Sequence, residues 1–137
     1  PEMRGGTANC SVVISDHEVG CPIVGEPDAV LVMNNPSLEK FESMLKPGGV
    51  LIINSSLVSV KPTRSDIRII EVPATDLEEE LGILKAMNII MLGAFAKATG
   101  CATEATMFKV FEKEFAARPH TIEPNKIAFK KGASLVN

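Results

Sequence analysis

The sequence has no tryptophan and no tyrosine, and phenylalanine occurs only six times in 137 residues. Surfaces that stack nucleic-acid bases are built from aromatic rings, so this scarcity argues against a single-stranded nucleic acid as partner. The charge argues the same way, because 14 basic and 17 acidic side chains leave a net charge of −3. Such a chain has no general electrostatic attraction to nucleic acid or to an anionic membrane.

Metal-binding residues are also few. The three cysteines, Cys10, Cys21 and Cys101, are widely spaced without a CxxC motif, and the two histidines, His17 and His120, lie far apart. A zinc site or an iron–sulfur cluster needs about four clustered ligands, so we expect neither on this chain alone. The cysteine usage predicts reduced thiols and a cytoplasmic location.

Long apolar runs are absent as well. The longest, Ile89–Ala96, is much too short to cross a bilayer, and no signal peptide begins the sequence. The length suits one domain over residues 1–137. Because the sequence opens on Pro1 rather than on methionine, we expect an N-terminal segment to be missing from it.

The first half of the chain alternates β-rich apolar runs with loops. It predicts strands at Ala8–Ser15, Asp28–Met33, Val50–Ile53 and Ile67–Val72. Pro36 suits the first turn of a helix capped by Asn34 or Asn35, and the turn Lys46–Gly49 ends that helix. Continuous apolar strands around a helix are typical of a βαβ unit in a parallel sheet covered on both faces.

The second half predicts helices. Thr75 and Glu78 match a capping box before one helix, and Met87–Ala98 reads as a buried helix that ends near Gly100. Thr103 can cap a third helix, and a last one runs from about Pro124 to Lys131 with Gly132 as its stop. We therefore predict an α/β fold, Rossmann-like and layered, with a mostly parallel central sheet and a helical C-terminal half.

The best candidate binding site lies at the carboxyl ends of two predicted strands, where open α/β sheets bind ligands beside helix N-termini. The polar residues at these ends are Asn34, Asn35, Asn54, Ser55 and Ser56. They suit a phosphate or carboxylate, although a helix cap and a simple turn explain them equally well.

A second candidate is Arg4 with Gly5 and Gly6, where glycines permit close approach of the backbone to a ligand; a flexible loop is the alternative. No catalytic constellation stands out.

Several short sequence segments, taken in their order along the chain, resemble one enzyme family. They are PEMRGGTANCSVVIS at Pro1–Ser15, Pro22–Val24, Asp28–Asn35, Lys46–Gly49, Asn54–Ser56, Val72–Thr75, Asn88–Gly93 and the closing Asn125, Ala128, Phe129 and Gly132. Together they are similar to gamma subunits of the 2-oxoacid:ferredoxin oxidoreductases, the pyruvate, ketoisovalerate and 2-oxoglutarate family. The resemblance covers nearly the whole chain, and its strength comes from the ordered combination.

The resemblance implies a subunit of a complex that oxidatively decarboxylates a 2-oxoacid to an acyl-coenzyme A. Thiamine diphosphate and iron–sulfur clusters belong to alpha, beta or delta subunits, and ferredoxin accepts the electrons. The gamma domain is mainly architectural and associated with coenzyme A, so the isolated chain is expected to be inactive. Its surface for the partner subunits should be partly apolar, so we also expect the isolated chain to form a homodimer. The family fold adds an antiparallel sheet. Its glycine-rich loop, which would precede Pro1, is not in this sequence, so the carried-over ligand residues are Arg4, Gly5 and Gly6.

Two other classes compete. The turn Leu45–Leu51 (LKPGGVL) resembles the same turn in class I SAM-dependent methyltransferases, but here Asn34, Asn35 and Pro36 enter the helix at once, and no C-terminal strand hairpin is predicted. The second rival is a purely structural interaction domain, which an isolated gamma subunit would closely resemble.

Overall fold

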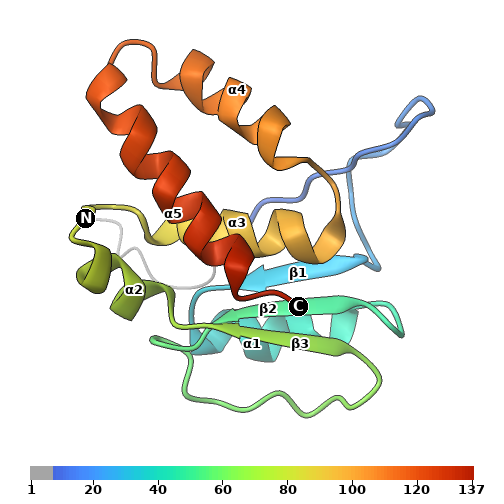
Figure 1. Cartoon of the computed structure of the whole chain (residues 1–137). Helices are drawn as coiled ribbons and strands as arrows, with labels where there is room; N and C mark the ends of the chain where they lie inside the picture. Colours follow the sequence, from blue (N-terminus) through green and yellow to red (C-terminus); the bar gives the residue numbers. More distant parts are fainter. Residues whose placement is uncertain (1–7) are drawn as a thin grey trace, which may run out of the picture.

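A three-stranded parallel sheet forms the centre of the computed structural model, which describes residues 8–137 (Figure 1). Its strands are β1 (Ala29–Val32), β2 (Val50–Asn54) and β3 (Arg68–Val72), in the order β1-β2-β3. Val32 pairs with Ile53, and Ile53 with Glu71. The three predicted strands from Asp28 onward and their parallel arrangement are confirmed.

One face of the sheet is covered by α1 (Asn35–Phe41) and the 3₁₀ turn η1 (Glu42–Met44). The helix begins as predicted, because the side chain of Asn34 accepts a hydrogen bond from the Ser37 amide at 2.9 Å and Pro36 occupies the first turn. Leu38 of α1 packs against Leu51 and Ile53 of β2 in one apolar cluster. This cluster joins the βαβ unit.

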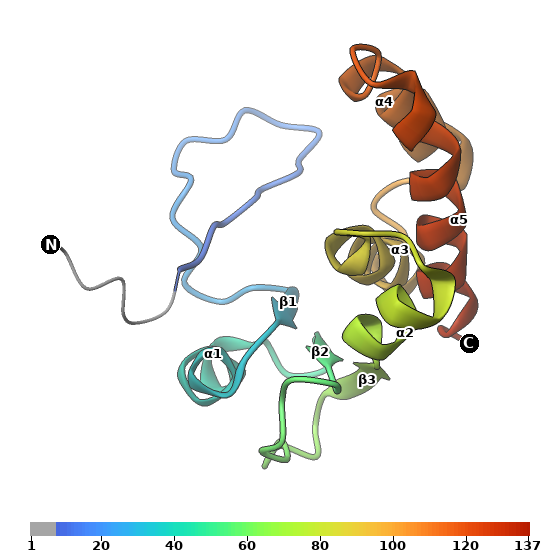
Figure 2. The same ribbon diagram turned by 90° about the vertical axis from the view of Figure 1, so that its left-hand side faces the viewer.

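The opposite face carries α2 (Ala74–Leu81), α3 (Met87–Thr99) and α5 (Ile122–Ser134). The alternate side chain of β2, Ile52, packs there with Ile90 of α3 and Ala128 of α5. Outside this layer, α4 (Glu104–Glu114) and η2 (Pro119–Thr121) lead back to α5. Phe111 of α4 meets Phe129 of α5 edge to face, with ring centroids 5.7 Å apart. Figure 2 shows the resulting layers edge on.

Two glycines set the spacing between α3 and α5. A Cβ atom on Gly132 would lie 1.8 Å from the carbonyl oxygen of Ile90, and one on Gly93 would lie 2.0 Å from that of Phe129. No side chain fits at either point, so the backbones are in direct contact. The prediction that Gly132 stops the last helix is wrong: the helix continues to Ser134, and Gly132 lies within it at the crossing.

The predicted strand Ala8–Ser15 is wrong too. No strand is assigned between residues 8 and 28, and Val12 and Ile14 are 76% and 74% exposed. The segment stands away from the sheet (Figure 2). A β-prone run forms a strand only when an edge pairs with it, and nothing in residues 8–137 does so. For the same reason the additional antiparallel sheet does not occur within the described part of the chain, whose only sheet is parallel.

The predicted capping box is a further correction. Helix α2 already begins at Ala74, and no side chain caps it. The carboxylate of Glu78 instead reaches forward, where its two oxygens accept hydrogen bonds from the amides of Lys85 and Met87 at 2.9 and 2.7 Å. It thus closes the connection between α2 and α3 and satisfies the first amide of α3.

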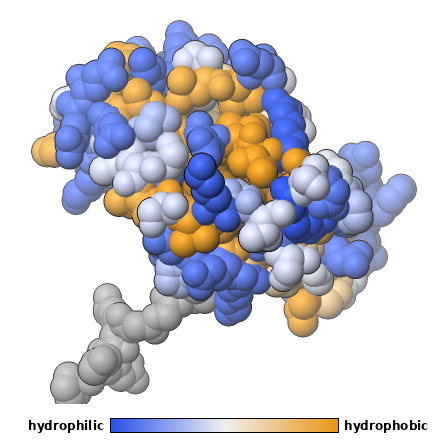
Figure 3. All heavy atoms as spheres, turned by 90° about the horizontal axis from the view of Figure 1, so that it is seen from below, coloured by the Kyte–Doolittle hydropathy of each residue, from blue (hydrophilic) through white to orange (hydrophobic). Residues whose placement is uncertain are grey.

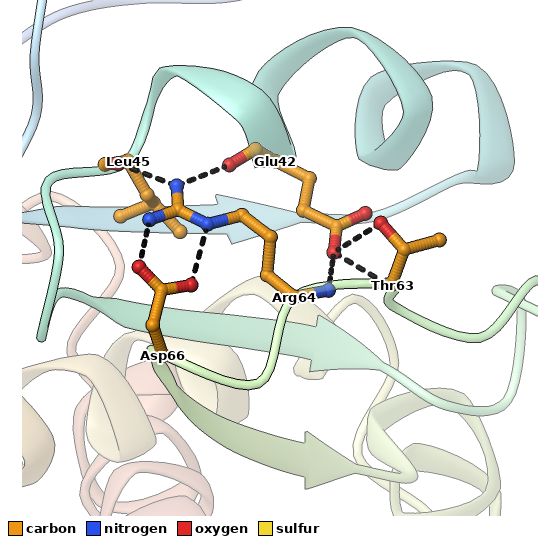
Figure 4. Close-up of polar contacts among 5 residues, drawn as sticks. All are labelled: Glu42, Leu45, Thr63, Arg64 and Asp66. Carbon is orange, nitrogen blue, oxygen red and sulfur yellow. Dashed lines mark hydrogen bonds and ion pairs between the residues drawn. The ribbon is translucent and has the colours of Figure 1, made fainter.

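The connection from β2 to β3, residues 55–67, crosses the α1 face without a helix, and Glu42 holds it (Figure 4). Glu42 is buried, with only 8% of the residue exposed. Its Oε1 accepts hydrogen bonds from the amides of Thr63 and Arg64 at 2.6 and 2.8 Å. The Arg64 guanidinium donates to the carbonyls of Glu42 and Leu45 and forms a bidentate pair with Asp66. That pair raises the pKa of Arg64 and lowers the pKa of Asp66.

The surface is mixed in polarity. Figure 3 shows apolar side chains, in orange, between polar ones on the face seen from below. None of the helices in residues 8–137 combines the length and apolar character needed to span a membrane.

Candidate functional site at the carboxyl edge of the sheet

The predicted polar residues do come to one edge of the sheet. Asn34 and Asn35 follow β1, and Asn54–Ser56 end and follow β2. Because β1 and β2 are parallel neighbours, both groups lie at the carboxyl edge. The N-termini of α1 and α2 lie at the same edge, since each helix follows a strand almost at once.

Asn54 is the centre of this edge and is fully buried. Its amide nitrogen lies 3.2 Å from Thr75 Oγ1 and 3.3 Å from Met87 Sδ, while its side-chain oxygen accepts a hydrogen bond from the Ser56 amide at 3.2 Å. The side chain therefore ties β2 to the starts of α2 and α3. The sequence pattern predicts Thr75 only as a helix cap and gives no sign of its contact with Asn54.

Asn34 and Asn35 also have structural partners. Asn34 caps α1, and the side-chain oxygen of Asn35 accepts hydrogen bonds from the amides of Ser59 and Val60 at 2.9 and 3.2 Å. Its amide group donates to Ser59 Oγ at 3.1 Å. For these residues the geometry supports the alternative interpretation, a cap and a brace for the following connection.

The serines leave more capacity for a ligand. Both are half-buried; the Ser55 amide donates to the carbonyl of Val72, and Ser56 Oγ accepts from the Asp76 amide at 3.2 Å. A hydroxyl that accepts one bond can still donate another. The polar residues predicted for this edge, all asparagines and serines within the described part, are thus neutral. Arg4, Gly5 and Gly6 lie outside the described residues.

Metal-binding side chains do not cluster in the described part of the chain. Within residues 8–137 no three His, Cys, Asp or Glu side chains come close enough to hold a metal ion. Cys10, Cys21 and Cys101 are all exposed and free. Arg64 and Asp66, whose pKa values are shifted by their mutual hydrogen bonds, belong to the β2–β3 connection rather than to the carboxyl edge.

Comparison with known proteins identifies the class. A family model described as pyruvate ferredoxin/flavodoxin oxidoreductase matches residues 1–135. The chain belongs to this family. The 2-oxoglutarate synthase subunit KorC from Methanothermobacter thermautotrophicus is 36% identical over 142 residues, which cover 99% of this chain and 74% of that subunit.

Solved structures agree. A keto/oxoacid ferredoxin oxidoreductase gamma subunit from Geobacter sulfurreducens superposes with a TM-score of 0.68 at 26% identity, covering 79% of this chain and 63% of the other. The 2-oxoglutarate:ferredoxin oxidoreductase from Magnetococcus marinus, solved with 2-oxoglutarate, coenzyme A and succinyl-CoA bound, has a TM-score of 0.75 at 21% identity. The superposition covers 88% of this chain and 21% of the Magnetococcus marinus chain, and it shows that the two share a fold.

These matches support the oxidoreductase interpretation over the methyltransferase alternative. The turn at Lys46–Gly49 fits both classes because each has a strand–helix–turn–strand unit. The family match, by contrast, extends over residues 1–135.

Proposed function

We propose that this chain is the gamma-type subunit of a 2-oxoacid:ferredoxin oxidoreductase, which oxidatively decarboxylates a 2-oxoacid and transfers the acyl group to coenzyme A. The observation that carries the proposal is the family match over residues 1–135. Thiamine diphosphate and iron–sulfur clusters belong to alpha, beta or delta subunits, and ferredoxin accepts the electrons. The chain itself contributes architecture and a surface for coenzyme A.

The coenzyme A surface comprises Arg4, Gly5 and Gly6 together with the carboxyl edge. Asn34, Asn35 and Asn54 shape this edge through their internal hydrogen bonds, while Ser55 and Ser56 offer hydroxyl donors. Arg4 adds a positive charge to this surface, and a planar guanidinium can bind a phosphate group through two hydrogen bonds. Coenzyme A is proposed as the ligand because the Magnetococcus marinus enzyme, which shares the fold, was solved with coenzyme A bound.

The segment 8–27 is the proposed contact with the other subunits. Val12, Ile14 and Ile23 are exposed by 76%, 74% and 83%, which a chain avoids unless another surface covers such side chains. In the assembled enzyme the alpha and beta subunits cover them. In the isolated chain a second copy takes their place and gives a homodimer.

The role of Arg4 predicts a specific kinetic defect. In the assembled complex, Arg4→Ala is expected to raise the KM for coenzyme A by about tenfold or more, because one charge-assisted contact to a phosphate contributes about 1.5–3 kcal/mol. The KM for the 2-oxoacid stays the same. Steady-state kinetics measure both, with Arg4→Lys as a partial rescue and Lys61→Ala, on the β2–β3 connection, as the control. An unchanged KM for coenzyme A with unchanged turnover contradicts the role.

A further inference from the structure

A groove on the helical side of the molecule, away from the sheet edge, has no role in the proposed function. It has a volume of about 610 Å³ and lies between the α2–α3 connection and the corner that joins α4 to α5. Figure 2 shows this corner above the α2–α3 connection. Apolar side chains, Ile83, Leu84 and Phe115, line it together with two cationic ones, Lys85 and Arg118, and with His120.

The side chains of Lys85 and Arg118 form no ion pair within residues 8–137, although the Glu78 carboxylate accepts a hydrogen bond from the Lys85 backbone amide. No carboxylate is among the residues that line the groove, and no ion pair or side-chain hydrogen bond of Lys85, Arg118 or His120 occurs in residues 8–137. The lysines of α5 differ, since Lys126 pairs with Glu112 and Glu123. Two cations, Lys85 and Arg118, thus line one groove of a chain whose net charge is −3.

Both walls of the groove are fixed. The Glu78 carboxylate binds the amides of Lys85 and Met87, and Lys85 adopts a left-handed backbone with φ of 64°. Leu84, the preceding residue, is 90% exposed. On the opposite wall, the Arg118 amide donates to the carbonyl of Phe115, and the amide and hydroxyl of Thr121 donate to that of Arg118.

We propose that this groove binds an acidic segment of a partner polypeptide that also carries apolar side chains. The unpaired cations select acidic residues by charge complementarity, and the apolar walls take the side chains between them. A polypeptide fits better than a small anion because Leu84 projects outward, so that only a surface arriving from outside can cover it. This inference does not depend on the oxidoreductase assignment.

A designed peptide tests the proposal with the whole chain. The probe is a fluorescein-labelled 12-residue peptide in which Glu alternates with Leu and Phe, and its control has Gln in place of every Glu. Fluorescence anisotropy at low salt is expected to show at least tenfold tighter binding of the acidic peptide, with the difference shrinking at 300 mM NaCl. Equal binding of both peptides overturns the proposal.

Variants locate the binding. Lys85→Ala combined with Arg118→Ala is expected to weaken binding at least about fivefold, and Leu84→Ala about fivefold without changing the thermal unfolding midpoint. The matched control, Lys61→Ala, removes an exposed lysine on the β2–β3 connection and leaves binding unchanged. An effect of Lys61→Ala equal to that of the double variant overturns the proposal. So does full displacement of the peptide by millimolar inorganic phosphate at constant ionic strength, which would identify a site for small anions.

Discussion

Replacing Gly132 by alanine is expected to lower the free energy of unfolding by about 3 kcal/mol or more. The new Cβ would lie 1.8 Å from the carbonyl oxygen of Ile90 and 3.0 Å from its Cα, so no rotamer change can relieve the contact. The helices α3 and α5 would have to separate. Their separation would open the core between Ile52, Ile90 and Ala128 and leave a cavity.

Urea unfolding followed by circular dichroism measures this loss. Gly25→Ala is the control, because a Cβ there meets nothing within 4 Å, and its effect should stay within about 0.5 kcal/mol. Gly93→Ala, which would bring a Cβ to 2.0 Å from the carbonyl oxygen of Phe129, should behave like Gly132→Ala. A loss below about 1 kcal/mol for both helix variants would show that the crossing is not as close as described.

Replacing Glu42 by alanine is expected to destabilise the fold by about 2–3 kcal/mol, because the amides of Thr63 and Arg64 lose a charged acceptor. The effect should be local as well as global. Hydrogen exchange at these two amides should accelerate more than exchange in β2, since the variant removes their acceptor while the sheet and the bonds of the Arg64 guanidinium to backbone carbonyls remain.

The matched variants for Glu42 are Glu42→Gln and Glu39→Ala. Glutamine keeps one acceptor oxygen and should retain part of the stability, whereas the exposed Glu39 in α1 should cost no more than about 0.5 kcal/mol. If Glu42→Ala and Glu39→Ala prove equally mild, the hydrogen bonds in Figure 4 do not hold the connection.

The neighbouring Asp66 has a lowered pKa because Arg64 binds its carboxylate. Its pair with Arg64 therefore stabilises the folded state fully above the ordinary pKa of Asp, and this stabilisation is lost as the pH falls through the lower folded-state pKa.

Local patterns predicted the parallel sheet well. The apolar run around Ile52 is buried on both faces, the run before Val32 is half-buried, and Asn34 with Pro36 marks the start of α1 as capping chemistry requires. The failures have a common cause in contacts between distant residues. Gly132 is a stop signal in isolation, but here its missing side chain admits the backbone of Ile90.

The candidate site shows the same division. Parallel topology alone places Asn34 and Asn54 at one edge of the sheet. The partners of these residues could not be predicted, because Asn35 binds Ser59 and Asn54 binds Thr75 across connections that no local pattern specifies. The valine-rich run near Val12 predicted a strand, yet a strand also needs a neighbouring edge, and a single sequence does not tell which edge is available.

As one subunit of an oxidoreductase, this chain is expected to be active only together with its partner subunits. The most direct measurement compares coenzyme A-dependent reduction of a viologen dye by the chain alone with that by the complex co-expressed with its alpha and beta subunits. We predict that the chain co-purifies with them, that the complex reduces the dye when a 2-oxoacid is supplied, and that the chain alone does not. Robust dye reduction by the isolated, metal-free polypeptide, or its failure to join the complex, would contradict the account.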